Sequence, residues 1–278
     1  MDLLVDGIDF GEGPRWHDGE LWYSDFHQRA IYAVTPDGTR RTVHGDLPDQ
    51  PSGLGWMPDG SLLAVAMTAR KVWRFDGDTR TQWADLSNVA TWHCNDMVVA
   101  TDGTAYVGNF GFDLEGAAKP AAATLARVAP DGSVHAAAEE LRFPNGSVIT
   151  PDGTTLIVGQ TMGANYIAFT INGDGTLTDR RVWAETPNMF PDGCCFDADG
   201  AIWFADALGS QLVRVKEGGE ITHQLPTPMP TYACMLGGAE ETTLYALCAP
   251  SSMTHETSGK AAGAIYAVPV DHPRAGRP

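Results

Sequence analysis

The chain has 278 residues, of which 43% are hydrophobic and 19% are charged, a composition typical of a globular protein. The chain has 18 lysines and arginines and 35 aspartates and glutamates, which gives a formal net charge of −17. We therefore expect neither a nucleic acid nor an anionic membrane surface as a partner. No stretch approaches the roughly 18 consecutive apolar residues of a membrane-spanning helix.

The N-terminal segment, MDLLVDGIDFGEG, carries acids throughout and no basic residue before its apolar part, unlike a secretory signal. The five cysteines are an odd number and lack the spacing of a disulfide framework. We therefore expect reduced, buried cysteines and a cytoplasmic protein. The residues DLLVD also suit a strand, which we expect to pair with the last predicted strand, residues 263–270, and to close the fold.

An Asp-Gly pair followed by a short alternating apolar run recurs along the chain. The turn residues of the six copies, the last with Glu in place of Asp, are Asp18, Asp59, Asp102, Asp152, Asp199 and Glu240. Such pairs between alternating runs indicate hairpins, and a second glycine-containing turn falls within most copies, so each copy predicts about four strands. The repeat predicts an all-β fold, a six-bladed β-propeller with four-stranded antiparallel blades, formed by residues 1–278 as a single domain.

Two segments depart from the repeat. The small-residue run at 116–126 lengthens the third copy and is expected as an insertion within that blade. The tail DHPRAGRP, residues 271–278, is expected to fray. A generic β-sandwich is the alternative fold, but it does not explain the regular spacing of the turns.

In a propeller the first strand of each blade meets the central channel, so residues at one position of successive copies form a ring. Seven residues before the turn, the copies carry Gly11 (with Glu12 next to it), Ser52, Asn95, Asn145, Asp192 and Ala233. Taken singly, each polar residue fits a turn. Together they offer two carboxylates and two amide oxygens, as a hard divalent cation requires. The predicted metal ligands are Glu12, Asn95, Asn145 and Asp192. Calcium fits this set best, magnesium and manganese are compatible, and zinc more often binds nitrogen or sulfur.

Several blocks of the sequence resemble the family of senescence marker protein, gluconolactonase and luciferin-regenerating enzyme. They are GEGPRW at 11–16, HCNDM at 93–97, FPNG at 143–146 and FPDGCCFDADGAIWFAD at 190–206. The resemblance, across nearly the whole chain, implies a six-bladed propeller with one catalytic divalent metal in the channel. It implies ligands at Glu12, Asn145 and Asp192, with Asn95 as a direct or water-mediated ligand. The sugar-lactonase branch usually carries Arg at the position of His93, so a less polar or differently charged lactone suits this chain as well.

The chemistry of the predicted site agrees with lactone hydrolysis. A cation at the ring would polarise the carbonyl and stabilise the oxyanion, and Asp192 would act either as general base on water or as nucleophile. The motifs of serine hydrolases, zinc proteases and phosphate-binding loops do not occur in the sequence. The alternatives are a calcium-binding propeller without turnover and a metal-dependent esterase or phosphotriesterase on the same fold.

Side chains around the channel mouth are expected to bind the small-molecule lactone or ester substrate. The predicted substrate-binding residues are His93, Trp16, Phe110, Met162 and Tyr232. Arg15 is expected to pair with an acid, and segment 251–260, with His255, is either a flap over the site or an ordinary surface loop. Three polar residues, each seven positions after a turn Asp, are expected to bond backbone: Asp25, Asn109 and Asp206. The sequence does not predict an oligomeric state.

Overall fold

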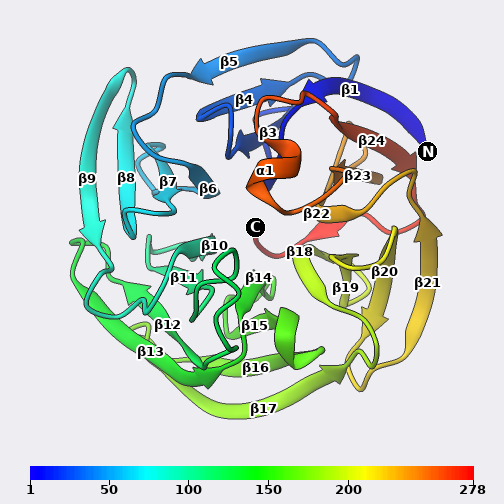
Figure 1. Ribbon diagram of the computed structural model, residues 1–278. Coiled ribbons are helices and arrows are strands. Elements are labelled where there is room, and N and C mark those ends of the chain that lie inside the picture. Colours follow the sequence, from blue (N-terminus) through cyan, green and yellow to red (C-terminus); the bar gives the residue numbers. More distant parts are fainter.

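Six antiparallel β-sheets surround a central axis in the computed structural model, which describes residues 1–278 (Figure 1). Each sheet runs outward from one inner strand, and the blades follow one another around the ring in chain order. The predicted six-bladed β-propeller with four-stranded antiparallel blades is therefore confirmed. Neither of the two short helices has the length and apolar character needed to cross a bilayer.

The first three blades are continuous in sequence. From the centre outward, the first consists of β2 (Gly11–His17), β3 (Glu20–Asp25), β4 (Ala30–Val34) and β5 (Arg40–His44). The second consists of β6 (Pro51–Trp56), β7 (Leu62–Ala66), β8 (Lys71–Asp76) and β9 (Thr79–Asp85). The third consists of β10 (Cys94–Val99), β11 (Ala105–Asn109), β12 (Ala123–Val128) and β13 (Val134–Leu141). The expected insertion lies in this third blade, between β11 and β12.

The last blade combines both ends of the chain. The fourth blade consists of β14 (Pro144–Ile149), β15 (Thr155–Gln160), β16 (Asn165–Ile171) and β17 (Leu177–Glu185). The fifth consists of β18 (Pro191–Asp197), β19 (Ala201–Asp206), β20 (Gln211–Lys216) and β21 (Ile221–Pro226), with β25 (Arg274–Ala275) added to it. The sixth consists of β22 (Thr231–Gly237), β23 (Thr243–Cys248), β24 (Gly263–Pro269) and β1 (Asp2–Ile8). The helices are η1 (Thr161–Gly163) and α1 (Thr254–Thr257).

The N-terminal strand closes the ring, as the sequence predicted. β1 is the outermost strand of the sixth blade and pairs antiparallel with β24, from Asp2 opposite Ala267 to Ile8 opposite Gly263. Backbone hydrogen bonds thus join the first strand of the chain to its last blade. The inner strands β10, β14 and β18 are buried along their whole length because neighbouring blades cover both of their faces. The five cysteines are buried and unpaired, as expected.

The C-terminal tail is ordered, and the prediction that it frays is wrong. β25 pairs with β18 on the side that faces the channel, and Arg277 exchanges two backbone hydrogen bonds with Ile149 of β14 (2.8 and 2.9 Å). Gly276 allows this approach because its φ is +65° and an added Cβ would lie 2.4 Å from the Ile149 carbonyl oxygen. The tail therefore ends near the central axis (Figure 1), where backbone pairing with two inner strands holds it.

The polar residues that follow the turns are structural, as predicted. Asp25 accepts hydrogen bonds from the backbone N–H groups of Asp9 (2.8 Å), Phe10 (3.3 Å), His27 (3.1 Å) and Gln28 (3.1 Å). Asp206 likewise accepts a hydrogen bond from the backbone N–H of Phe190 (3.0 Å), so Asp25 and Asp206 both fix the chain where it enters an inner strand. Asn109 instead donates to the Thr124 carbonyl of β12 (2.7 Å) and accepts from the backbone N–H of Gly111 (3.1 Å).

Asp25→Ala is expected to lower the free energy of unfolding by about 2–4 kcal/mol, because it leaves four backbone N–H groups without their acceptor. Guanidinium denaturation monitored by circular dichroism measures the change. Asp59→Ala, which removes an exposed turn aspartate, is the control and should shift the midpoint far less. Equal shifts for the two variants would contradict a special role for Asp25.

Candidate functional site

One residue of every inner strand occupies an equivalent position in the propeller. In each blade, the last residue of the second strand pairs with a residue of the inner strand, and the position in question is the next one along the inner strand. In the first blade Asp25 pairs with Gly11, so the position is Glu12. In the third blade Asn109 pairs with Cys94, so the position is Asn95. The other four blades obey the same rule. We call these six residues the ring: Glu12, Ser52, Asn95, Asn145, Asp192 and Tyr232. Each is at most 7% exposed.

The one-residue offset of Glu12 in the sequence comes from a short hairpin loop. His17 pairs with Glu20, so the turn has only two residues, Asp18 and Gly19, with φ of 49° and 80°. Positive φ at both positions is the signature of a type I′ turn, which matches the twist of a hairpin. The second and third blades have three residues in the corresponding loop. Counting back from the turn therefore misplaces the first blade, and strand pairing restores Glu12 to the register of the other blades.

The sixth ring position belongs to Tyr232, and the prediction of Ala233 there is wrong. Thr231 pairs with Cys248, and Tyr232 is the next residue along β22. The hairpin loop after Gly237 has five residues, 238–242, so counting back from its turn residue ends one position too late. The ring thus carries a phenol where sequence counting expected a methyl group.

A cavity of about 600 Å³ opens above the ring, at one mouth of the channel. It is lined by all the ring residues except Ser52. The four predicted metal ligands therefore share one cavity wall. Four of the predicted substrate-binding residues also line it: His93, Phe110, Met162 and Tyr232.

Trp16, the fifth predicted substrate-binding residue, does not reach this cavity. Its indole stacks on the ring of Tyr245 with centroids 5.8 Å apart and packs against Gly237. It lines a second cavity of about 510 Å³, together with Arg277 of the tail. Trp16 lies four residues beyond Glu12 along β2, so it is carried away from the mouth where the ring opens. The structure thus places it with the hydrophobic core and not with the ring.

Above the ring, a second set of residues repeats in all six blades. In each blade, the residue two positions before the ring residue accepts a hydrogen bond through its backbone carbonyl. The donor is the backbone N–H of the residue just after the second strand, as in Phe26 to Phe10 (3.1 Å) and Phe110 to His93 (2.9 Å). We call these pairs the collar: Phe10–Phe26, Gln50–Met67, His93–Phe110, Phe143–Thr161, Phe190–Ala207 and Pro230–Ala249. The first five pairs line the cavity.

Sequence reasoning missed most of the collar, although the sequence contains its signal. Phenylalanine stands two positions before Glu12, Asn145 and Asp192, in the segments FGEG, FPNG and FPDG. The ring register places those phenylalanines at the cavity wall. His93, chosen as a substrate-binding residue, occupies the same position in the third blade.

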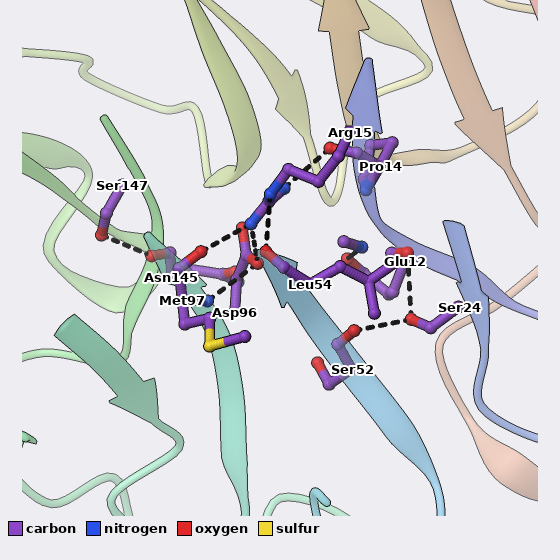
Figure 2. Close-up of polar contacts among 11 residues, drawn as sticks. Glu12, Pro14, Arg15, Ser24, Ser52, Leu54, Asp96, Met97, Asn145 and Ser147 are labelled. Atoms are coloured by element: carbon purple, nitrogen blue, oxygen red, sulfur yellow. Dashed lines mark hydrogen bonds and ion pairs between the residues drawn. The ribbon is translucent and has the colours of Figure 1, made fainter. Parts of the chain in front are cut away.

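A buried ion pair lies beside the ring. Arg15 of β2 and Asp96 of β10 reach toward each other (Figure 2), with Nη2 of Arg15 2.6 Å from Oδ1 of Asp96. Both residues are 4% exposed. The guanidinium also donates to the carbonyl oxygens of Leu54 (2.9 Å) and Met97 (2.6 Å), so it joins three inner strands. The expectation that Arg15 pairs with an acid is confirmed.

The ring backbone is clamped by a buried serine. The Ser24 hydroxyl contacts the carbonyl oxygens of Glu12 (3.0 Å) and Ser52 (2.8 Å), linking the first two blades (Figure 2). Gly13 permits this approach of the two strands, because an added Cβ would lie 2.8 Å from the Ser52 carbonyl oxygen. The positions of the ring residues are thereby determined by backbone contacts between blades.

Negative charge is concentrated at the ring. Burial raises the pKa of Glu12 well above its ordinary value, and the charges of Asp192 and Asp96 raise it further. Burial also raises the pKa of Asp192, with a further contribution from Asp96. The only guanidinium in contact with this group is bound to Asp96. Two buried carboxylates therefore face one cavity without a cationic side chain of their own.

Three oxygen atoms of the ring lack hydrogen-bond partners. They are Oγ of Ser52, Oδ1 of Asn145 and Oδ1 of Asp192, all fully buried. The amide nitrogen of Asn145 donates a hydrogen bond to Thr161 Oγ1 (3.1 Å), and the Thr161 hydroxyl donates to the Pro191 carbonyl oxygen (2.7 Å). Because the hydrogen bond to Thr161 orients the Asn145 amide, its oxygen points away from protein donors. Buried polar atoms are rarely left unpaired in native proteins, and two of these three, in Asn145 and Asp192, belong to residues that line the cavity.

Two loops border the cavity on its open side. The insertion of the third blade contributes Asp113 and Glu115, and the segment before β24 contributes Ser252 and Thr254. Glu115 accepts hydrogen bonds from the backbone N–H (3.1 Å) and the hydroxyl of Thr254. His255 does not line the cavity, and its side chain is 74% exposed. The expected flap segment thus borders the site through Ser252 and Thr254.

Residues 10–249 match the family described as SMP-30/Gluconolactonase/LRE-like region. The chain belongs to this family. The match extends from just before Glu12 in the first blade to just after β23 in the last, so it includes every ring residue. The resemblance carried by the GEGP, FPNG and FPDG segments is confirmed.

Relatives of this SMP-30/gluconolactonase family member match it over nearly their full length. A 6-deoxy-6-sulfogluconolactonase from Pseudomonas putida is 24% identical, with 96% of this chain and 94% of the relative aligned. The solved structure of a gluconolactonase from Xanthomonas campestris is 26% identical, with a TM-score of 0.77 and coverage of 97% and 89%. Regucalcin from Agrobacterium tumefaciens, a calcium-binding protein, shares the fold at 21% identity, with a TM-score of 0.82 and coverage of 99% and 95%.

The ring of this family member is a mixed set of carboxylate, amide and hydroxyl groups. Nowhere do three or more His, Cys, Asp or Glu side chains gather in a metal-binding arrangement. A cation at the ring would therefore be held by two carboxylates completed by neutral oxygens. Such a set suits a hard cation and gives no soft ligand. The unpaired oxygens of Asn145 and Asp192 and the uncompensated carboxylate of Glu12 fit a divalent ion of this kind.

Proposed function

We propose that the protein is a divalent-metal-dependent hydrolase of lactones, with the ring as its metal site. The observation that carries this proposal is the pair of buried carboxylates, Glu12 and Asp192, at the floor of an open cavity with unpaired oxygens beside them. The names of the relatives, gluconolactonase and 6-deoxy-6-sulfogluconolactonase, support a lactone as the class of substrate.

The residues that would hold the ion are Glu12, Asn95, Asn145 and Asp192. Calcium is the proposed ion because all four contribute oxygen, and magnesium, manganese and zinc are alternatives. When bound, the ion supplies Lewis-acid polarisation of the lactone carbonyl. Regucalcin, with the same fold, is described as calcium-binding, which supports this choice.

The protein's own side chains have separate roles in the proposed reaction. Asp192 accepts the proton of the attacking water while the water oxygen bonds to the carbonyl carbon, and the ring C–O bond breaks as the leaving alkoxide takes this proton from Asp192. In the alternative route the Asp192 carboxylate attacks the carbon, the ring C–O bond breaks, and water then hydrolyses the resulting acyl–enzyme anhydride, giving one proton to the alkoxide. Burial raises the pKa of Tyr232 to about 12, so its hydroxyl stays protonated at neutral pH and can donate a hydrogen bond within the cavity. The collar lines the cavity above the ring with mostly apolar side chains.

Calcium is expected to stabilise the folded protein at the ring. After removal of metal with EDTA, calcium at 100 times its dissociation constant should add about 2.7 kcal/mol to the unfolding free energy. Glu12→Gln should lose most of this gain, whereas the exposed control Asp2→Asn should keep it. Differential scanning calorimetry and lactone hydrolysis are measured on the same samples. Unchanged stability and unchanged turnover after chelation would overturn the proposal.

The second candidate function is calcium binding without turnover, which the calcium-binding description of regucalcin favours. Its signature is calcium-dependent stabilisation through Glu12 with no hydrolysis of any lactone. A panel that adds an aryl ester and a phosphotriester tests the third alternative, a metal-dependent esterase or phosphotriesterase on the same ring. Each alternative therefore gives its own pattern of stabilisation and turnover.

A further inference from the structure

We infer that the cavity selects neutral lactones with a flat apolar body over polyhydroxylated or anionic sugar lactones. This inference rests on the proposed lactonase function and concerns the substrate class of the same site. The oxygen-rich ring would receive the polar carbonyl end, and the collar above it would receive the rest of the molecule. A cavity of about 600 Å³ has room for a bicyclic compound.

The collar offers few groups to bind substrate hydroxyls. Of its ten residues that line the cavity, five are phenylalanines and two more are Met67 and Ala207. Among the three polar ones, the Thr161 hydroxyl is already hydrogen-bonded to the Pro191 carbonyl, and the Gln50 amide lies 3.4 Å from a ring nitrogen of His27. Each substrate hydroxyl left unpaired against such a wall would cost about 1–3 kcal/mol.

The aromatic side chains form two walls on opposite sides of the cavity. In the first and sixth blades, Phe10 packs on Phe26 (centroids 5.3 Å apart) and on Tyr232 (4.7 Å). In the third and fourth blades, Trp92 stacks on His93 (5.0 Å), and Phe110 stacks on Phe143 (4.6 Å). In a ring of six blades these two pairs of blades face each other.

A flat ring between two such walls makes apolar contact on both faces, and aromatic pairs add about 0.5–1.5 kcal/mol beyond the burial of area. A sugar ring with equatorial and axial hydroxyls presents fewer carbon atoms to either wall. The geometry of the walls therefore favours the flat apolar body.

The charges around the cavity disfavour an anion. No lysine or arginine lines it. Two histidines, His27 and His93, line it, and burial lowers the pKa of His27, which keeps that imidazole neutral at neutral pH. On the open side, Asp113 and Glu115 bond only N–H and hydroxyl groups and have no basic partner. A sulfonate or phosphate on the substrate would meet like charge there, whereas the hydroxy-acid product would be repelled toward solvent.

Steady-state hydrolysis of three lactones in the presence of calcium tests whether the cavity selects neutral, flat lactones. The probes are 3,4-dihydrocoumarin (flat and neutral), δ-gluconolactone (neutral and polyhydroxylated) and 6-deoxy-6-sulfogluconolactone (anionic). We expect kcat/KM to be at least ~100-fold higher for dihydrocoumarin than for gluconolactone, and lowest for the sulfonate. Equal or higher kcat/KM for either sugar lactone would overturn the inference while leaving the proposed lactonase function intact.

Substitutions in the cavity wall test whether its lack of a cationic side chain causes the discrimination against an anionic lactone. Phe110→Arg should reduce the preference for dihydrocoumarin over the anionic lactone by ~10-fold or more, since it places a cation in the wall, whereas Phe110→Leu should change that ratio by less than ~3-fold. Met162→Arg, at a position 38% exposed on the cavity edge, gives the same test if Phe110→Arg does not fold. Val182→Ser, on the outer strand β17, is the matched surface control. If neither arginine substitution changes the ratio of kcat/KM for dihydrocoumarin to that for the anionic lactone, the proposed electrostatic discrimination against anions is contradicted.

A binding measurement separates this inference from the proposed function. The unreactive lactam 3,4-dihydro-2-quinolinone and gluconolactam are titrated by calorimetry into the calcium-loaded protein. Tighter binding of the quinolinone by ~100-fold supports the substrate class even if no lactone is hydrolysed, in which case only the lactonase proposal fails. Equal or tighter binding of gluconolactam overturns the inference.

Discussion

Asp192→Asn is expected to lower kcat/KM for lactone hydrolysis by roughly 10³-fold while the propeller stays folded. The substitution keeps the size of the side chain but replaces the carboxylate, whose Oδ1 has no partner inside the protein, with a neutral amide. Both proposed roles of Asp192, general base and nucleophile, need an ionised carboxylate. Hydrolysis of dihydrocoumarin in saturating calcium measures the loss, and near-UV circular dichroism verifies the fold.

The same substitution should stabilise the metal-free protein. The pKa of Asp192 is raised in the folded state, so the folded protein holds this proton more tightly than the unfolded chain and ionisation at neutral pH opposes folding. Removing the charge should raise the melting temperature in EDTA by a few degrees and abolish most of the calcium-dependent rise. Glu12→Gln should act in the same direction. Wild-type turnover in Asp192→Asn, or a lower melting temperature without metal, would refute this account of the ring.

Arg15→Met is expected to lower the unfolding free energy by about 3–5 kcal/mol in the metal-free protein. It leaves Asp96 buried and unpaired and removes the donor that joins three inner strands. Urea denaturation in EDTA measures the loss. Calcium should stabilise this variant more than it stabilises the wild type, because the Asp96 carboxylate, no longer neutralised by Arg15, attracts the cation together with Glu12 and Asp192.

The matched control removes both charges. Arg15→Met with Asp96→Leu leaves no unpaired ion and should recover much of the lost stability, because apolar replacement of a buried ion pair is often neutral or favourable. Gly53 limits the recovery, since its Cα approaches Asp96 closely and an added Cβ there would lie 2.6 Å from Oδ1. A double variant as unstable as Arg15→Met would show that the loss comes from packing and not from charge.

The repeat made the architecture predictable from the sequence. Hairpin turns are local, so an Asp-Gly pair between alternating runs reports the same structure wherever it occurs, and six such copies leave little choice of fold. The same regularity of the sequence predicts Asn95, Asn145 and Asp192 at one position of three blades. Phe110 and Met162, predicted as substrate-binding residues at the channel mouth, both line the cavity.

Counting along the chain failed where a loop changed length. A two-residue turn in the first blade and a five-residue loop in the sixth each moved the count by one position, which affected Glu12 and Tyr232. Strand pairing corrects both, because backbone hydrogen bonds and not sequence distance define the register. Trp16 was misplaced for a related reason: four residues along an inner strand carry a side chain from the ring to the other end of the channel.

The sequence by itself determined the six blades and the ring positions of Asn95, Asn145 and Asp192, since these arise from local turns and their repetition. It also predicted closure by β1, because DLLVD suits a strand that the last blade still lacks. The tertiary structure alone decided which residues meet across the axis. It paired Arg15 with Asp96, brought the tail beside β14 and β18, and set the aromatic walls opposite each other. These contacts join blades that are far apart in the chain, and their partners are defined only once the ring has closed.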